Sequence, residues 1–311
     1  MKIMLDSGAF SVWRSGLSIN LDDYIAFCKT YKNVSYFVNL DIIPKGHQKS
    51  ESACEQSWSN YQKMVRNLPR GKVIPVFHQG ENIRWLQKYL DLTSYVGISP
   101  DNKKSYADRL QWIRKLRVKV GGCEAKFHGF AVASYGMLEG FPWHSVDSTT
   151  WAQHARVWQI LIPKMKRGQY DYRETPLVVK LSPRNTRTGN YHINSLSPMV
   201  KEQVLSYVND NRMRLGKFLV CKCSNGYKTK KGEYWLNKTG REVVKTEEIG
   251  LSTDIEQRML LNSRYYLEMA KSLSISDFYL SGMSSVPEWI NEVPCILVSF
   301  NHIPKGFRKW L

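Results

Sequence analysis

Short apolar runs alternate with amphipathic segments over the first half of the chain. The apolar runs cover residues 2–5, 36–40, 73–77, 95–98, 127–133 and 145–146. Most are nearly continuous rather than alternating, which is typical of strands buried on both faces of a parallel sheet. The segments between them predict helices over residues 22–31, 51–68, 82–92 and 106–116. This alternation predicts either an open doubly wound sheet or a closed (β/α)8 barrel.

The residues at the ends of these runs favour the barrel. Polar or ionisable side chains follow run after run, namely Asp6, Asp41, His78 with Gln79, Ser99, Ser134 and Asp147. A TIM barrel keeps its active site at the C-terminal ends of its strands, whereas a dinucleotide-binding fold has a G-x-G-x-x-G loop after its first strand. The first run ends in DSGAFSVW, which lacks that glycine spacing. We therefore predict an α/β fold, a (β/α)8 TIM-type barrel.

The second half of the chain predicts an insertion and the closing strands of the barrel. Residues 184–250 are rich in Lys, Gly and Asn, and predict a basic β-rich lobe inserted within a single domain of residues 1–311. The other predicted elements are a helix over 151–165, a strand over 177–181, a helix over 254–273 and strands over 278–280 and 296–300. We expect the last two strands to complete the barrel.

The charge balance predicts a polyanionic partner. The chain has 45 Lys and Arg against 27 Asp and Glu, a net charge of +18 and a pI near 9.6. Neutralising phosphates with Lys or Arg releases condensed counterions, so nucleic acid is the favoured partner. The residues that we expect to hold its backbone are Arg184, Arg187, Lys228, Lys230 and Lys231. The alternative for these side chains is an ordinary solvated loop.

The composition indicates a globular protein of the cytoplasm, the host cytoplasm if the protein is viral. Of its 311 residues 42% are hydrophobic and 23% are charged, which argues against disorder. No apolar stretch reaches the roughly 18 to 20 residues of a membrane span, and Asp6 precedes any apolar signal-peptide core. Six cysteines in a chain of this length are too few for a disulfide scaffold.

Three carboxyl groups predicted at one barrel end suggest a specific chemistry. Asp6, Asp41 and Asp147 would raise one another's pKa, and perturbed acids cluster at functional sites. One carboxylate that attacks a carbon while another transfers the proton is the arrangement of glycosyl transfer with retention. The alternative is that all three are ordinary strand-end residues that cap helices or pair with Lys and Arg.

Four motifs resemble the signatures of tRNA-guanine transglycosylases. LDSGAF at residues 5–10 is similar to D-S-G-G-F-Q, and FHQGE at residues 77–81 is similar to V-Q-G-G. HGFAVAS at residues 128–134 is similar to G-G-L-A-V-G, and HSVDSTTW at residues 144–151 has the place of the nucleophile strand G-I-D-x-F-D. The motifs keep the family's order, and the resemblance covers residues 1 to about 155.

The resemblance implies a role for each matching residue. It implies that Asp147 attacks C1′ of a guanine nucleotide and that Asp6 is the general acid and base. At the base itself it implies that Asp41 and Gln79 read the Watson–Crick edge. The backbone around Gly129 would meet the carbonyl oxygen of the base. Ser7 would also bind the base, and Phe10 is a candidate stacking surface. For Phe10, core packing is the alternative.

The sequence also departs from the family, and the departures favour a particular branch. Cys221 and Cys223 keep the C-x-C of the family's zinc site, but Gly226 stands at the third cysteine position and no histidine follows at a suitable distance. A structural zinc site usually has four ligands. A Zn²⁺ ion bound here would have only Cys221 and Cys223 from the family's ligand set, as a remnant of that site. The compact start and the segment SVDSTTW resemble the short, phage-type DNA 7-deazaguanine transglycosylases.

That branch implies a function in DNA modification. It implies exchange of guanine in double-stranded DNA for a 7-deazaguanine base such as preQ0, through a covalent intermediate, which protects viral DNA from restriction. The alternatives are base exchange in tRNA, a base-removing glycosylase, and a non-catalytic nucleic-acid-binding barrel. No membrane partner is expected.

Overall fold

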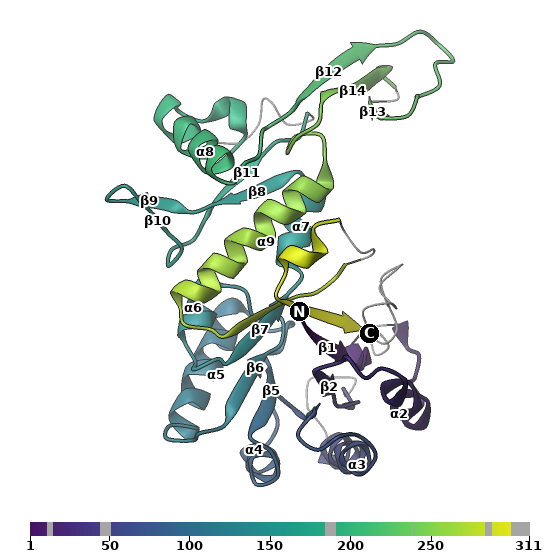
Figure 1. Ribbon diagram of the computed structural model, residues 1–311, viewed down its shortest axis with the longest axis vertical. Coiled ribbons are helices and arrows are strands. Elements are labelled where there is room, and N and C mark those ends of the chain that lie inside the picture. The colour runs from purple at the N-terminus through teal and green to yellow at the C-terminus, as the bar shows by residue number, and fades with distance from the viewer. Residues whose placement is uncertain (11–14, 44–50, 184–190, 238, 284–287, 300–311) are drawn as a thin grey trace. The chain divides into compact units, whose positions relative to one another are not determined.

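The chain forms two compact units. The computed structural model describes residues 1–10, 15–43, 51–183, 191–237, 239–283 and 288–299 (Figure 1). The first unit comprises Met1–Thr149 together with Leu273–Leu311, and the second comprises Thr150–Ser272. The second unit thus lies, in sequence, between the two segments of the first.

A parallel sheet that returns to its starting point forms the first unit. Its order is β3 (Val73–Ile74), β2 (Tyr36–Val38), β1 (Lys2–Asp6), β16 (Cys295–Ser299), β15 (Asp277–Leu280), β7 (Ser145–Ser148), β6 (Lys126–Gly129), β5 (Tyr95–Ser99) and β4 (Val76–His78). Every pair of neighbouring strands is parallel. The two end strands, β3 and β4, are separated along the chain by Pro75 alone, whose carbonyl oxygen accepts from the Gly97 amide of β5 at 2.8 Å. The sheet is therefore nearly closed and barrel-like, compatible with a TIM-type barrel.

Helices flank this sheet on the outside (Figure 1). They are α2 (Leu21–Thr30), α3 (Glu51–Asn67), α4 (Ile83–Leu90), α5 (Tyr106–Lys119), α6 (Tyr135–Glu139) and the 3₁₀ turn η2 (Glu288–Glu292). Polar side chains cap the N-termini of several of these helices. The Asn20 side chain accepts from the Asp22 amide at 2.8 Å, and the Ser105 hydroxyl accepts from the Asp108 amide at 3.1 Å. These caps satisfy amides that have no partner within the first helical turn.

A buried cluster fills the inner face of the sheet and fixes which side chains point inward. It takes side chains from strands around the sheet, namely Met4, Val38, Ile74, Val76, Tyr95, Tyr279 and Cys295. Asp6 stands two residues after Met4 on β1, so its side chain leaves from the same face. Asp147 pairs in register with Tyr279 and shares its face as well. The fold therefore directs both carboxyl groups inward.

The second unit is a mixture of small antiparallel sheets and helices. Its elements are α7 (Thr150–Arg156), β8 (Gln159–Ile162), β9 (Lys164–Lys166), β10 (Gln169–Asp171), β11 (Leu177–Lys180), η1 (Ile193–Ser195), α8 (Pro198–Asp210), β12 (Lys217–Lys222), β13 (Glu233–Asn237), β14 (Glu242–Glu248) and α9 (Ile255–Ser272). Strands β8 and β11 pair, as do β9 and β10, and a three-stranded sheet has the order β12-β14-β13.

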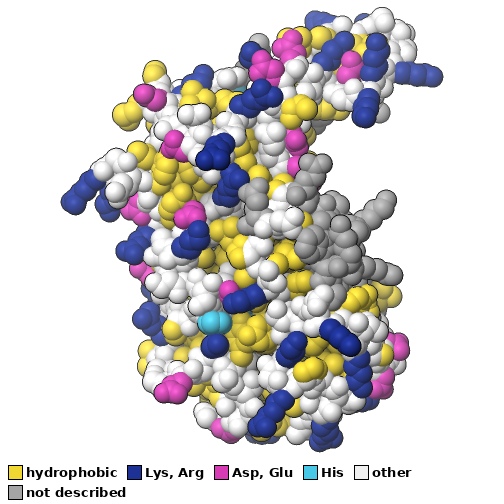
Figure 2. All heavy atoms as spheres, in the orientation of Figure 1, with side chains coloured by type: hydrophobic (Ala, Val, Ile, Leu, Met, Phe, Trp, Pro, Cys, Tyr) yellow, Lys and Arg dark blue, Asp and Glu magenta, His cyan; other side chains and the backbone are white. Residues whose placement is uncertain are grey.

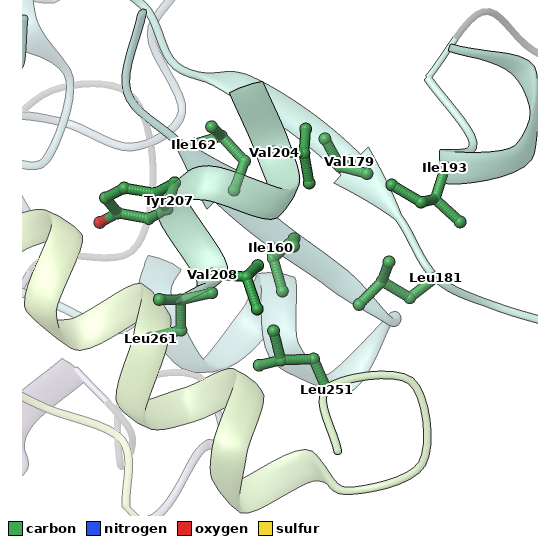
Figure 3. Close-up of a cluster of buried hydrophobic side chains, with 10 residues drawn as sticks. All are labelled: Ile160, Ile162, Val179, Leu181, Ile193, Val204, Tyr207, Val208, Leu251 and Leu261. Atoms are coloured by element: carbon green, nitrogen blue, oxygen red, sulfur yellow. The ribbon is translucent and has the colours of Figure 1, made fainter. Parts of the chain in front are cut away.

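One core joins β8, β11, α8 and α9 within this unit (Figure 3). Its buried side chains are Ile160, Ile162, Val179, Leu181, Ile193, Val204, Tyr207, Val208, Leu251 and Leu261. The amide of Asn262, which is fully buried on α9, completes it: the oxygen accepts from the Leu161 amide at 2.9 Å, and the nitrogen donates to the carbonyls of Trp151 and Gln159. This side chain satisfies three backbone groups that water cannot reach.

The structure corrects some of the predicted elements and confirms others. The helix predicted over 151–165 is wrong, because α7 ends at Arg156, Trp158 has a φ of 56°, and β8 follows. The strand predicted over 127–133 ends at Gly129, since Ala131 has a φ of 54° that no strand accommodates. The strand predicted over 177–181 is confirmed as β11, which pairs antiparallel with β8 in the second unit. The two closing strands, β15 and β16, are confirmed.

We expect Asn262→Leu to lower the free energy of unfolding of the second unit by about 3 kcal/mol, because the substitution leaves three buried backbone groups without partners. Urea unfolding followed by circular dichroism measures the effect. The control is Asn209→Leu, at an exposed position on α8. Equal unfolding midpoints for the two variants would contradict the assignment.

Candidate active site

Three carboxyl groups meet at the C-terminal ends of the strands of the first unit. Asp6 is the last residue of β1, Asp147 lies in β7, and Asp41 follows β2 by three residues. Asp41 and Asp147 are both 7% exposed. The charges of both act on the Asp6 carboxyl group, so the three are neighbours in space. The structure thus brings together the three acids that the sequence pattern placed at one barrel end.

Burial and the two neighbouring carboxylates make Asp6 a weak acid. Burial, which disfavours the charged form, is the larger cause, and the charges of Asp41 and Asp147 add to it. Hydrogen bonds from the Gly8 and Ser7 amides oppose the shift, the former at 3.3 Å. The result raises the pKa of Asp6 from 3.8 to about 7. A carboxyl group with this pKa both gives and takes a proton near neutral pH.

Asp147 is held by donors on both of its oxygens. Its Oδ1 accepts from the Ala131 amide at 2.9 Å, and its Oδ2 accepts from the Ser281 hydroxyl at 3.0 Å. Ala131 follows β6 in a left-handed conformation, with a φ of 54°. The Nε2 atom of His128 lies 3.5 Å from Oδ1. These contacts fix the carboxylate in one orientation.

A histidine connects Asp41 to a second carboxylate. The His78 Nε2 atom lies 2.8 Å from Asp41 Oδ2, and its Nδ1 atom lies 2.8 Å from Glu81 Oε1. The side chains of all three residues are no more than 7% exposed. A ring that carries protons on both nitrogens satisfies both carboxylates. His78 therefore holds the Asp41 carboxylate in one orientation and links it to Glu81.

The other residues predicted to bind the base, Gln79, Ser7, Phe10 and Gly129, differ in their contacts and exposure. The Gln79 Oε1 atom accepts from the Asp101 amide at 3.0 Å, which holds this side chain to the loop after β5. The buried Ser7 hydroxyl accepts from the Ala9 amide at 3.4 Å, while Phe10 is 51% exposed. Gly129 packs so closely on Trp143 that an added Cβ would lie 3.0 Å from its ring.

Sequence reasoning missed the side chains that support the three acids. His128, Glu81 and Ser281 were given no role, and His78 was noted only as the end of a run. A signal was present in two motifs: HGFAVAS and FHQGE carry His128 and Glu81 where the similar family segments have glycine. A polar side chain in place of glycine beside a predicted site indicates an added contact.

The predicted nucleic-acid contacts lie in the second unit. Lys228, Lys230 and Lys231 are exposed on the segment between β12 and β13, whereas Arg184 and Arg187 lie outside the described residues. Glu233 holds this segment, because it accepts from the Tyr227 hydroxyl at 2.7 Å and from the Lys230 amide at 3.0 Å. Lys and Arg side chains are numerous over the three-stranded sheet in Figure 2.

The cysteine pair of the family's zinc motif lies in the second unit. Cys221 and Cys223 are half-buried free thiols at the end of β12. Within the described part of the chain, no group of three or more His, Cys, Asp or Glu side chains is arranged to hold a metal ion. The residues described here therefore do not fit a four-coordinate zinc site. Among the same residues, no helix combines the length and the apolar character needed to cross a membrane.

The chain was compared with protein-family models and with curated proteins. No protein-family model matches the chain, and no curated protein matches it significantly. The interpretation of the site therefore depends on its geometry and on the motifs in the sequence.

The raised pKa of Asp6 predicts a gain in stability on removal of its charge. Since the pKa is about 7 in the folded protein and 3.8 ordinarily, the folded state binds this proton more tightly. Binding of this proton stabilises the folded state fully below about pH 4, and this stabilisation is lost as the pH rises to 7. We expect Asp6→Asn to be about 2–4 kcal/mol more stable than the wild type at pH 8, and nearly equal at pH 4.

Thermal unfolding at both pH values tests this expectation, with the exposed Asp91→Asn as the control for loss of one negative charge. A constant difference between Asp6→Asn and the wild type at both pH values would show that the charge of Asp6 is not the cause.

Proposed function

We propose that this protein is a transglycosylase that replaces guanine in double-stranded DNA by a 7-deazaguanine base such as preQ0. The observation that carries the proposal is the placement of two carboxyl groups at strand ends of one sheet: Asp147, held by donors on both oxygens, and Asp6, whose pKa is raised by burial and by the charges of Asp41 and Asp147. A fixed nucleophile and a proton carrier are the two groups that base exchange requires. The four motifs that resemble tRNA-guanine transglycosylases support the same reaction.

In the first step Asp147 is the nucleophile. Its carboxylate attacks C1′ of the nucleotide, the bond between C1′ and N9 breaks, and the electron pair leaves with guanine. Asp6 in its acid form gives its proton to the departing base. The transition state resembles an oxocarbenium ion, which the nearby carboxylates stabilise.

In the second step the same groups act in reverse. The N9–H of the incoming 7-deazaguanine gives its proton to the Asp6 carboxylate, and N9 attacks C1′. The ester bond to Asp147 breaks, and its electron pair returns to the carboxylate. Asp6 is again an acid, so both protons are accounted for and each turnover restores the site.

Recognition of the base is assigned to Asp41. Guanine presents an N1–H and an amino group side by side, and a carboxylate accepts from both. The contact from His78 Nε2, at 2.8 Å, holds the Asp41 carboxylate in a fixed direction for this purpose. Gln79 is the second candidate, with its amide oxygen already bonded to the Asp101 amide.

The basic sheet of the second unit is assigned to the nucleic acid backbone. Between residues 217 and 248 the sequence has eight Lys or Arg against four Glu. Two of these lysines are paired, Lys217 with Glu248 and Lys245 with Glu233, while Lys228, Lys230 and Lys231 extend into solvent. Base exchange in a duplex requires the base to leave the stack, and cationic side chains hold the distorted backbone. In a viral genome the product would protect the DNA from restriction.

Incubation of the purified protein with preQ0 and duplex DNA, followed by nucleoside digestion and mass spectrometry, tests the exchange. We expect incorporation by the wild type, none by Asp147→Ala or Asp6→Ala, and a rate about 10²- to 10⁴-fold lower for Asp6→Asn, which cannot transfer a proton. Asp91→Asn is the control and should match the wild type.

Parallel reactions separate the alternatives. Incorporation into tRNA but not DNA would support tRNA base exchange, and free guanine without incorporation would support a glycosylase. Binding without any reaction would support a non-catalytic barrel. Full activity of Asp147→Ala would exclude the covalent mechanism.

Replacement of Lys228, Lys230 and Lys231 together by alanine should weaken DNA binding to all sequences alike. Because each phosphate contact contributes about 0.9 to the slope of log K against log salt, we expect the slope to fall by roughly 2 to 3. The control is a triple alanine variant at the exposed Lys32, Lys115 and Lys119 of the first unit, which changes the net charge equally. Identical slopes for the two variants would reject the proposed contact of these three lysines with the nucleic acid backbone.

A further inference from the structure

A series of hydrogen-bonded buried side chains on three strands of the barrel-like sheet ends at Asp147, the proposed nucleophile. The Tyr95 hydroxyl lies 2.5 Å from the Ser145 hydroxyl, which lies 2.6 Å from His128 Nδ1. The other ring nitrogen, Nε2, lies 3.5 Å from Asp147 Oδ1. His128 and Ser145 are completely buried, and Tyr95 is 5% exposed. The four residues come from β5, β6 and β7, three neighbouring strands.

The direction of the hydrogen bonds in this series follows from its two ends. Asp147 Oδ1 only accepts, so the Nε2 atom that faces it carries a proton. Nδ1 then accepts from the Ser145 hydroxyl, and the Ser145 oxygen accepts from the Tyr95 hydroxyl, whose proton burial retains by raising its pKa. The opposite tautomer would point the lone pair of Nε2 at a carboxylate oxygen, which is repulsive in a buried site.

Among the described residues, His128 Nε2 has no other partner. It is a buried polar atom without a hydrogen bond of normal length, and Asp147 Oδ1 is the acceptor that it faces. Hydrogen bonds at catalytic groups are often long before the substrate binds, and shorten in the complex. The ring itself is held edge-on by Phe130 and Tyr279, at 4.5 and 5.7 Å between centroids, so it cannot turn away.

We propose that His128 is a positioning residue whose Nε2–H makes Asp147 a better leaving group in the second half of the reaction. This inference rests on the proposed function. An N–H group bonds more strongly to a carboxylate than to an ester oxygen. His128 therefore stabilises the released carboxylate relative to the covalent adduct. It speeds the step in which the C1′–oxygen bond breaks, and it gives no help to the formation of that bond.

The tautomer is tested without any activity measurement. In protein labelled with ¹⁵N-histidine, the His128 signals are assigned by their loss in His128→Gln. We expect a protonated Nε2 and an unprotonated Nδ1, and a shift of the Nδ1 signal in Ser145→Ala, which removes its donor. An unprotonated Nε2, or a ring protonated on both nitrogens, would overturn the proposed direction of the series.

The kinetic role is tested by following the covalent adduct. Wild-type protein is incubated with duplex DNA, the adduct is quantified on a denaturing gel, and preQ0 is then added. In His128→Leu we expect adduct formation at the wild-type rate and adduct decay about tenfold to a hundredfold slower, the effect of one charge-assisted hydrogen bond. His128→Gln should recover part of the decay rate, because its amide nitrogen is a donor.

The outcomes separate this inference from the proposed function. Absence of any adduct in the wild type would refute the covalent mechanism itself, whatever the tautomer of His128. An adduct whose decay is unchanged in His128→Leu would refute the role of His128 alone. Equal slowing of formation and decay in that variant would show a structural effect, and would also refute it.

Discussion

The burial of three carboxyl groups at one end of the sheet is the constraint that the candidate site depends on. Like charges at short range in a poorly solvated place destabilise one another, and here the cost falls on Asp6, whose pKa rises to about 7. The remaining charges are offset by donors: the Ala131 amide and the Ser281 hydroxyl at Asp147, and His78 at Asp41. These donors reduce the cost of placing three carboxyl groups at the ends of the strands.

The same constraint gives the acids different properties. Asp147 has donors on both oxygens, whereas Asp6 receives two amide hydrogen bonds that do not outweigh its burial. One fixed carboxylate beside one carboxyl group of raised pKa is therefore a consequence of where the donors lie, and not of residue type. Groups whose surroundings drive their pKa values apart mark the division of acid and base roles in many enzymes.

The charge of Asp6 lowers folding stability at the place where the proposed reaction uses it, a common opposition between stability and function at active sites. The fold tolerates this because the cost is local. The inner cluster of the first unit and the core of the second are apolar and well buried, and neither includes the three acids. The second unit contributes basic side chains on a separate sheet, where repulsion among lysines is relieved by solvent and by Glu233 and Glu248.

The sequence by itself determined the alternation of strands and helices, and with it the inward direction of Asp6 and Asp147, because parallel strands align their ends and side chains alternate along each strand. It could not determine the partners of those acids. That Ala131 turns its amide to Asp147, that Gln79 bonds to the Asp101 amide and that His128 faces Asp147 are decided by the register between strands and by single backbone angles. Helix α7 likewise stops at Arg156 because residue 158 adopts a left-handed conformation within the second unit. Such contacts join residues distant along the chain, and no local pattern of apolar and polar positions records them.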